Sequence, residues 1–190
     1  MRINKKYRFM SLLIIAVTLV VVIRFINEGG NIMNYSNFEE LIVTSDSFED
    51  GGTMPIQYTG RGEDISPSLS LSTISENAVS IAIIMDDLDV PIIGTYNHWV
   101  IWNIPVQNII PENIPHGDIV ESLGNAVQGN GYGKHGYRGP KPPFGSHRYQ
   151  FHVFILDCEL DLSNNTRKKE LLESMNGHIL QYGCIMGIFE

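Results

Sequence analysis

Three separate stretches of the sequence carry side chains that could bind a small anion. Asp87 and Asp89 follow one apolar run, His98 lies within an aromatic run, and His147 and Tyr149 open a third run. Imidazole and phenol groups can donate hydrogen bonds to anionic oxygens. These residue types therefore indicate an anion-binding site, provided that the fold brings the three stretches together.

A stiff and basic loop precedes His147. Three prolines and two glycines fall within residues 139–147, and residues 134–148 carry the cations Lys134, Arg138, Lys141 and Arg148. A loop that is already ordered loses less conformational entropy on binding, and its cations could form an anion-binding rim. The alternative is a surface loop whose cations pair with the acidic excess of the chain.

The other two stretches also have ordinary structural explanations. Asp87 and Asp89 could cap a turn at a solvated strand end, because carboxylates often accept hydrogen bonds from turn backbone. His98 could be a packed, hydrogen-bonded core residue beside the tryptophans. Spacing alone leaves both alternatives open.

Short apolar runs bounded by turn residues predict strands. The three most evident strands cover residues 78–87, 97–105 and 147–157. Successive side chains of a strand point to opposite faces, so His147 and Tyr149 should share one face at the start of the third strand.

The same alternation places the remaining candidates. Asp87 and Asp89 are two residues apart and should project to one side of an extended segment. In the second strand, His98 should share a face with Val100 and Trp102.

One helix follows the strands. Leu171, Leu172, Met175 and Ile179 recur at helical spacing, Asn165 or Thr166 is the expected N-cap, and Gly177 should break or bend the helix. Strands in succession with a peripheral helix near the C-terminus predict a mainly β fold, an antiparallel β-sandwich.

The N-terminus differs from the rest of the chain. Four basic residues precede an apolar run within residues 1–28, which predicts an uncleaved signal anchor, with a cleaved signal peptide and a buried helix as alternatives. The basic cluster keeps the N-terminus in the cytoplasm. We therefore expect a single-pass protein of the cell membrane, or otherwise a secreted one, with a linker at 29–40 and an exported domain at 41–190.

The charge of the chain narrows its possible binding partners, and its two cysteines allow two arrangements. Residues 1–28 hold five of the 13 basic and one of the 21 acidic residues, which leaves 8 basic and 20 acidic residues and a formal net charge of −12. Such a domain repels nucleic acid and gains no electrostatic attraction to an anionic lipid surface. Cys158 and Cys184 form either a disulfide, which an exported location permits, or two buried thiols.

Five motifs form a specific pattern through their residues and their order along the chain. The segments "SFEDGGTMPIQYTGRGEDISPSL", "MDDLDVP", "NHWVIWNIP", "GYRGPKPPFGSHRYQFHVFILD" and "ELLESMNGHIL" occur in that order between Phe48 and Phe189. Together they resemble the phosphatidylethanolamine-binding protein (PEBP) family, and most of all its bacterial branch, often labelled Raf kinase inhibitor-like.

The resemblance implies a fold and a pocket. The fold is a sandwich of two antiparallel sheets with Greek-key connections, and the pocket at one end binds anions such as phosphate, acetate or a phosphoethanolamine head group. The positions that match the family pocket are Asp87, Asp89, His98, Pro143, His147 and Tyr149. An aspartate would orient one imidazole or meet an ammonium group. It would also raise the pKa of that histidine, so anion affinity should rise as the pH falls.

This sequence departs from the family pattern at several positions. Leu88 and Val90 replace the usual proline and alanine, Lys141 replaces a cysteine that is frequent in bacterial members, and no cysteine follows Tyr58-Thr59. Lys141 adds positive charge near the mouth of the expected pocket.

We therefore expect a binding domain outside the cytoplasm whose pocket takes a small anion or a phosphorylated head group. The alternative is an inhibitor or regulator of a partner protein, such as a kinase or a serine peptidase. We do not expect an enzyme, because HExxH, GxSxG and a cysteine–histidine nucleophile pair are lacking. No cofactor, metal ion or nucleic-acid partner is expected, and contact with the membrane would be made through the N-terminal segment.

Overall fold

The structure, a computed structural model, describes residues 35–190. The predicted anchor or signal peptide at 1–28 and residues 29–34 of the predicted linker lie outside these described residues. Among the helices that are described, none has both the length and the apolar character needed to cross a membrane.

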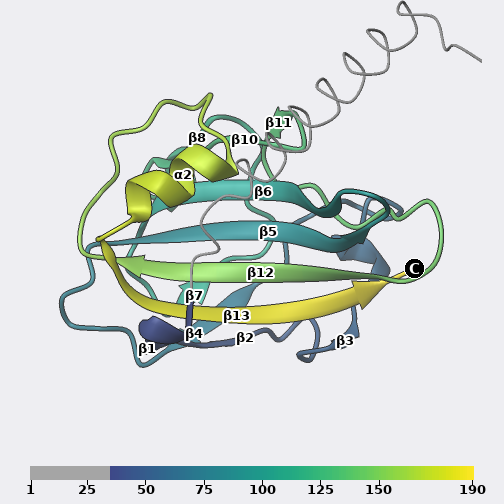
Figure 1. The fold of residues 1–190 in the computed structure, drawn as a ribbon, viewed down its shortest axis with the longest axis horizontal. Helices are drawn as coiled ribbons and strands as arrows, with labels where there is room; N and C mark the ends of the chain where they lie inside the picture. Colours follow the sequence, from purple (N-terminus) through teal and green to yellow (C-terminus); the bar gives the residue numbers. More distant parts are fainter. Residues whose placement is uncertain (1–34) are drawn as a thin grey trace, which may run out of the picture. The chain divides into compact units, whose positions relative to one another are not determined.

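A large mixed sheet forms the centre of the described domain (Figure 1). Its eight strands run in the order β1-β13-β12-β5-β6-β9-β8, with β3 also paired to β13. The four long strands are antiparallel neighbours, whereas the short β1 and β3 pair in parallel with β13. The strands are β1 (Glu39–Glu40), β3 (Gly52–Thr53), β5 (Ser80–Val90), β6 (Gly94–Pro105), β8 (Ile119–Val120), β9 (Ala126–Gln128), β12 (His147–Leu156) and β13 (Ile179–Phe189).

A smaller sheet packs on one face of the large sheet, so the fold is a mainly β sandwich, as predicted. Side chains of both sheets meet in one buried cluster, which includes Leu69 and Leu71 from the small sheet and Ile83, Phe151 and Val153 from the large one. Burial of this apolar surface is the main force that joins the layers. The small sheet contains β2 (Ile42–Thr44), β4 (Leu69–Ser72) and β7 (Ile109–Ile110) in the order β2-β4-β7. The Greek-key connections stay a prediction.

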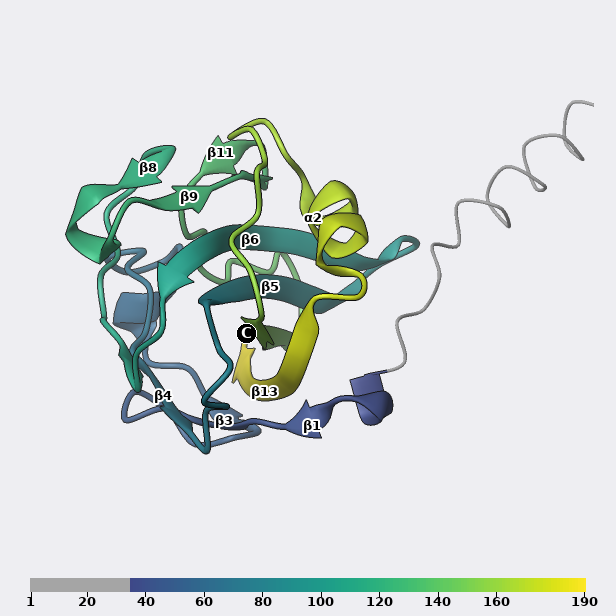
Figure 2. The same cartoon turned by 90° about the vertical axis from the view of Figure 1, so that its left-hand side faces the viewer.

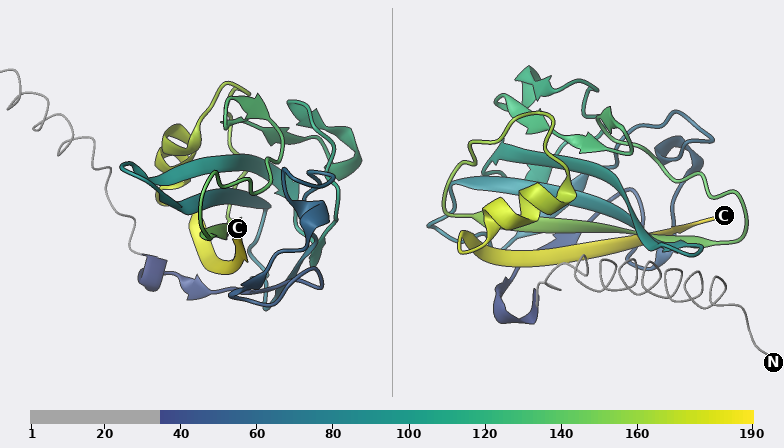
Figure 3. Two further views of the ribbon diagram at one scale, coloured as in Figure 1. Left: turned by 90° about the vertical axis from the view of Figure 1, so that its right-hand side faces the viewer. Right: turned by 45° about the horizontal axis from the view of Figure 1, so that its top comes forward.

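The single described α-helix covers the other face of the large sheet. Helix α2 (Lys168–Met175) buries Leu171 and Met175 against Val100, Trp102 and neighbouring side chains. Figure 2 shows β4 and α2 on opposite sides of the large sheet, and the right panel of Figure 3 shows α2 lying across its strands. Both faces of the central strands are therefore buried, which explains why β5 is an almost continuous apolar run.

Short elements complete the described domain. Strands β10 and β11 form a two-residue-per-strand antiparallel pair near the β6 edge. These elements are β10 (Asn130–Gly131), β11 (Lys134–His135) and the 3-10 turns at Tyr35–Asn37, Ile56–Tyr58 and Glu121–Leu123.

The C-terminal segment differs from the sequence prediction. The helix begins after Arg167 and not after Asn165 or Thr166, because Glu170 accepts a hydrogen bond from the Arg167 N–H at 3.1 Å and closes the first turn there. It ends before Gly177, whose φ is 86°, so the predicted break is confirmed. Ile179 then opens β13, a strand that helical spacing concealed.

The second half of the predicted linker belongs to the folded domain. Residues 39 and 40 pair with β13, and the ring of Tyr35 stacks on that of Tyr182 with centroids 4.2 Å apart. The sequence analysis predicted either a disulfide or two buried thiols for the cysteines, and both alternatives were wrong. Both are free thiols, and Cys158 is only partly buried while Cys184 is exposed.

Candidate functional site

Five of the six predicted site residues line one cavity of about 290 Å³. The cavity lies where β12 begins and the β5–β6 hairpin turns, at the right-hand end of the large sheet in Figure 1. The five are Asp87, His98, Pro143, His147 and Tyr149. The other lining residues are Gly60, Val90, Pro91, Ile93, Tyr96, Tyr132, Arg138, Gly139, Lys141 and Pro142. Three distant stretches of the chain therefore meet at one site.

The centre of the site is a buried carboxylate–imidazole pair. Antiparallel pairing of β5 with β12 sets Asp87 directly opposite Tyr149. The His147 Nδ1–H donates to the Asp87 carboxylate at 2.8 Å, and both residues are at most 5% exposed. Because Nδ1 is engaged, the Nε2 edge of His147 is the one left to contact a ligand.

His98 reaches the cavity through a β-bulge, and the predicted face of this residue was wrong. On β6, Asn97 pairs with Asp86 and Trp99 pairs with Met85, so His98 is one extra residue between two regular pairs. A bulge re-aims a side chain, and here it turns His98 away from the face of Val100 and Trp102 and towards Tyr149.

The amide of Asn97 stabilises this bulge. Its Nδ2 donates to the carbonyls of Met85 and Trp99 at 3.0 and 3.1 Å and lies 3.2 Å from the Asp86 carboxylate. These bonds satisfy backbone acceptors beside the interrupted ladder. The position of His98 is therefore fixed by its neighbours in the sheet.

Burial sets the charge state of His98. Its Nδ1–H donates to the backbone carbonyl of Arg138 at 2.8 Å, which again leaves Nε2 for a ligand. Removal from water lowers the pKa of His98, an effect that outweighs the hydrogen bond to Arg138 and the attraction of Asp87. Asp87 does raise the pKa of His98, as expected for a histidine beside an aspartate, but burial outweighs this effect, so His98 is mainly neutral at pH 7.

Tyr149 contributes a phenol to the same wall. The residue is fully buried, and its ring meets that of His98 edge-on with centroids 5.3 Å apart. Burial, and next the charge and hydrogen bond of Asp87, raise the pKa of Tyr149 far above its ordinary value. The phenol stays protonated, and its O–H is shared with the Asp87 carboxylate.

Asp89 does not line the cavity. Its carboxylate binds the guanidinium of Arg148 through two contacts of 2.7 and 2.9 Å, and accepts the Arg148 backbone N–H at 2.8 Å. The hydrogen bond to the Arg148 side chain lowers the pKa of Asp89 to about 2. The Asp89 N–H in turn donates to Asp87 at 2.9 Å. Asp89 thus clamps the ends of β5 and β12 at the rim and supports Asp87.

The proline-rich loop is anchored at several points. Arg138 and the backbone N–H of Gly139 both donate to the carboxylate of Asp64, at 2.7 and 2.6 Å. The guanidinium of Arg61 donates to the Pro142 carbonyl at 2.8 Å. The sequence analysis missed this support, because the partners are more than 70 residues apart along the chain.

The sequence analysis also missed two aromatic side chains that line the cavity. The rings of Tyr96 and Tyr132 lie 6.2 and 5.0 Å from that of His98 and meet each other edge-on, with centroids 5.2 Å apart. Isolated tyrosines in turn-rich segments carry no sequence signal that would have found them. Lys141 does line the cavity, and within residues 35–190 its ammonium group has no carboxylate partner.

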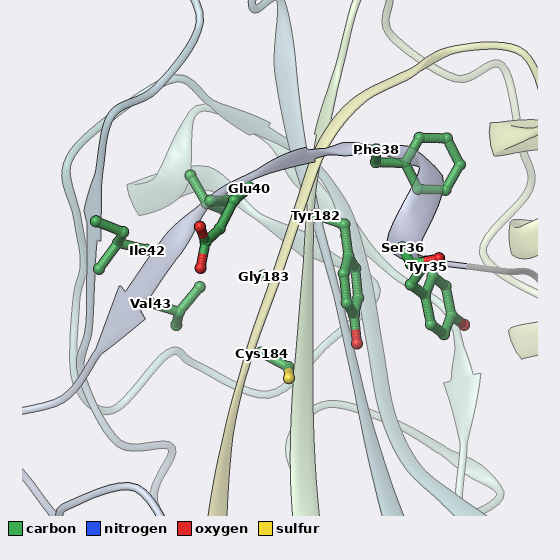
Figure 4. Close-up of a pocket in the computed structure, with 10 residues that line it drawn as sticks. Tyr35, Ser36, Phe38, Glu40, Ile42, Val43, Tyr182, Gly183 and Cys184 are labelled. Atoms are coloured by element: carbon green, nitrogen blue, oxygen red, sulfur yellow. The ribbon is translucent and has the colours of Figure 1, made fainter.

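A second, larger hollow of about 490 Å³ has a different character (Figure 4). It lies beside β1, β2 and β13, and its walls include the stacked rings of Tyr35 and Tyr182 and the thiol of Cys184. Among the described residues that line it, Glu40 is the only charged one. A lining with a carboxylate and no cation does not suit an anion, so the smaller cavity is the candidate anion site.

Comparisons with known proteins identify the family of this chain. The family model for phosphatidylethanolamine-binding protein matches residues 44–190. A UPF0098 protein of Pyrococcus abyssi is 43% identical over 155 residues, 80% of this chain and 86% of that protein. A UPF0098 protein of Chlamydia muridarum is 39% identical over 153 residues, 78% of this chain and 97% of that protein.

Solved structures show the same fold. A putative PEBP homologue from Chlamydia trachomatis has 34% sequence identity and a TM-score of 0.72, covering 80% of this chain and 98% of that one. E. coli YbcL, a member of the mammalian PEBP family, has 27% identity and a TM-score of 0.68 over the same shares. The family motifs, the family model and these structures agree, and the chain belongs to the phosphatidylethanolamine-binding protein family.

Proposed function

We propose that this domain binds the phosphoryl group of a small anion, and of a phospholipid head group in particular, without catalysing a reaction. The observation that carries the proposal is the convergence of His98, His147 and Tyr149 on one cavity, beside Lys141, which has no carboxylate partner among residues 35–190. Buried side chains of this kind are positioned before the ligand arrives, so little ordering is needed on binding.

Protonation should accompany anion binding. The Nδ1–H groups of His98 and His147 are already donated to Arg138 and Asp87, so a neutral ring offers only an Nε2 lone pair to the ligand. An anion oxygen cannot donate to that lone pair unless it carries a proton itself. Binding of an unprotonated phosphoryl oxygen should therefore place a proton on one of the rings, and its affinity should fall as the pH rises.

The rim of the cavity supports a head group that belongs to a lipid. Ile92 is fully exposed at the tip of the β5–β6 hairpin, with the exposed Ile93 beside it, and Phe144 is exposed in the proline-rich loop next to the lining residue Pro143. Exposed apolar side chains around a polar site are typical of surfaces that meet another apolar body. A zwitterionic head group suits this acidic domain better than an anionic lipid surface, which would repel it.

Histidine NMR tests the site directly. The full-length chain would be titrated in separate experiments with inorganic phosphate, phosphoethanolamine and a short-chain phosphatidylethanolamine. We expect the ring signals of His98 and His147 to shift in each case, with the tightest binding for the lipid. His147→Ala should abolish binding, whereas His116→Ala, at an exposed residue outside the cavity, should not.

The three ligands distinguish the possible outcomes. Tighter binding of phosphate than of the lipid would replace the head-group proposal by a free-anion site. Absence of any shift at His98 and His147 would refute anion binding. A pulled-down protein that still binds His147→Ala would favour the alternative, an inhibitor or regulator that uses a surface outside the cavity.

We also propose that residues 1–28 hold the domain outside the cytoplasm at the cell membrane. The basic cluster followed by an apolar run supports this location. A reporter enzyme that is active only after export, fused after Glu190, should be active and should fractionate with membranes. Activity in the soluble exported fraction would indicate a cleaved signal peptide, and inactivity would refute the proposed location.

A further inference from the structure

A second cluster of reactive side chains lies at the far end of β12 from the anion cavity. The β12–β13 ladder pairs Leu156 with Ile179, and the next N–H, that of Asp157, donates to the carbonyl of His178 at 3.1 Å. Asp157, the first residue after β12, and His178, the last residue before β13, are therefore held side by side. Asp157, Cys158 and His178 are brought together by this pairing.

The backbone around the cysteine is held at two further points. The hydroxyl of Ser80 donates to the Cys158 carbonyl at 2.5 Å. The side-chain amide of Asn103 accepts from the Leu160 N–H at 2.9 Å and donates to the Leu160 carbonyl at 3.0 Å. The segment that carries the thiol is thus tied to β5 and β6, although it has no regular secondary structure.

We propose that Asp157, Cys158 and His178 form a binding site for a divalent transition-metal ion, with zinc as the best match. One ligand atom from each side chain (a carboxylate oxygen, the thiol sulfur and an imidazole nitrogen) lies within 4.8 Å of the other two. The site shares no residue with the anion cavity, and it stands or falls independently of the proposed head-group binding.

The spacing suits a tetrahedral ion after a small adjustment. Metal bonds of about 2.0–2.3 Å place tetrahedral ligand atoms about 3.3–3.5 Å apart. The His178 Nδ1 now lies 2.8 Å from the Asp157 carboxylate oxygen, in hydrogen-bond contact. An ion would replace the shared proton and part these two atoms by about 0.5 Å. Both side chains are exposed, so they are free to move that distance.

The donor set selects the kind of metal. Thiolate and imidazole ligands suit zinc, cobalt and copper, whereas magnesium and calcium prefer sites made of oxygen ligands alone. Cysteine binds as the thiolate, so binding should release a proton. Three protein ligands leave a fourth position that faces solvent, which gives the ion a route of entry.

Cobalt spectroscopy tests the site, because a thiolate–cobalt bond gives a near-ultraviolet charge-transfer band that histidine and carboxylate ligands do not give. The reduced full-length chain would be titrated with Co²⁺. We expect one equivalent to produce the band, together with the visible absorption of tetrahedral cobalt. The band should disappear on addition of zinc, because tetrahedral sites with a thiolate ligand favour zinc.

Matched variants assign the ligands. Cys158→Ser should remove the band, whereas Cys184→Ser, at the exposed cysteine on β13, should keep it. His178→Gln and Asp157→Asn should each weaken cobalt binding by about 10-fold or more. Glu159→Gln, at the neighbouring exposed acid, should change the affinity by less than about 3-fold, since a nearby exposed charge contributes little.

Alkylation of the wild-type chain keeps the test independent of the variants. If Cys158→Ser does not fold, zinc should still slow alkylation of Cys158 by at least about 10-fold, as mapped by mass spectrometry, while Cys184 reacts at its former rate. A missing charge-transfer band would overturn the proposal. A band that survives Cys158→Ser, or equal reactivity of Cys158 with and without zinc, would also overturn it.

Discussion

His152 should make the domain lose stability as the pH falls through the weakly acidic range. This histidine lies on the face of β12 opposite to His147 and Tyr149 and is largely buried. Its Nδ1 accepts the hydroxyl of Tyr182 at 2.7 Å, and its Nε2 lies 3.5 Å from the Asp86 carboxylate. Asp86 is already paired with the ammonium of Lys168, from α2, at 2.5 Å.

The size of the effect follows from the pKa. Burial, opposed by Asp86 and assisted by Lys168, lowers the pKa of His152 from 6.5 to about 4. The unfolded chain therefore binds a proton at a higher pH than the folded chain, and stability falls as the pH drops from about 6.5 towards 4. Linkage gives a loss of about 2 kcal/mol at pH 5 and about 3 kcal/mol at pH 4, relative to pH 7.

Urea unfolding of the wild type and of His152→Gln at pH 7 and pH 5 measures this loss. Glutamine does not titrate, so the variant should lose about 2 kcal/mol less than the wild type between the two pH values, whatever its stability at pH 7. His116→Gln, at an exposed histidine, serves as the control and should retain the wild-type loss. If His152→Gln loses as much stability as the wild type, the assignment of the acid sensitivity to His152 is refuted.

Three further predictions concern the supports of the anion cavity. Asp89→Asn should lower the free energy of unfolding in urea by less than about 1 kcal/mol, because the pair with Arg148 is solvent-exposed. It should change the affinity for phosphate by less than about 2-fold, and a loss of binding would show that Asp89 touches the ligand. Gly139→Ala should destabilise the domain by about 1–3 kcal/mol and weaken anion binding, since the new Cβ would lie 2.5 Å from the Tyr58 carbonyl; unchanged thermal stability would contradict this crowding. Ile92→Gly should raise stability by up to about 1 kcal/mol, because φ is 75° at Ile92 and the strain of a β-branched residue there exceeds the entropy cost of glycine; a lower urea midpoint would contradict it.

The local sequence was sufficient to predict which side chains share a face of a regular strand. His147 and Tyr149 share a face because β12 is uninterrupted from the cavity to its far end, with a register shift only between Ile155 and Leu156. The apolar run at residues 78–87 likewise predicted a strand, which the structure contains as β5. The family motifs supplied Pro143, which no physical periodicity would have selected.

The remaining errors come from pairing between distant segments. The bulge that turns His98 is visible only when β6 is set against β5, and the role of Asp89 depends on Arg148, 59 residues away. Strand β13 was missed because its first residue, Ile179, continues the helical spacing and because glycines interrupt the rest of its pattern. A Cβ at Gly183 would lie 2.1 Å from the Leu41 carbonyl, so the glycine is required by a neighbouring segment and not by β13 itself.

Because of the bulge on β6, the cavity residue His98 is not needed for the pairing of β6 with β5. His98 is surplus to the ladder, because the residues before and after it already face consecutive partners on β5. A chain lacking this single residue could close the gap with an ordinary antiparallel register and leave both hydrophobic layers unchanged. Such a deletion would yield a folded sandwich whose cavity has one imidazole fewer, and so a scaffold in which ligand preference can be rebuilt without reworking the core.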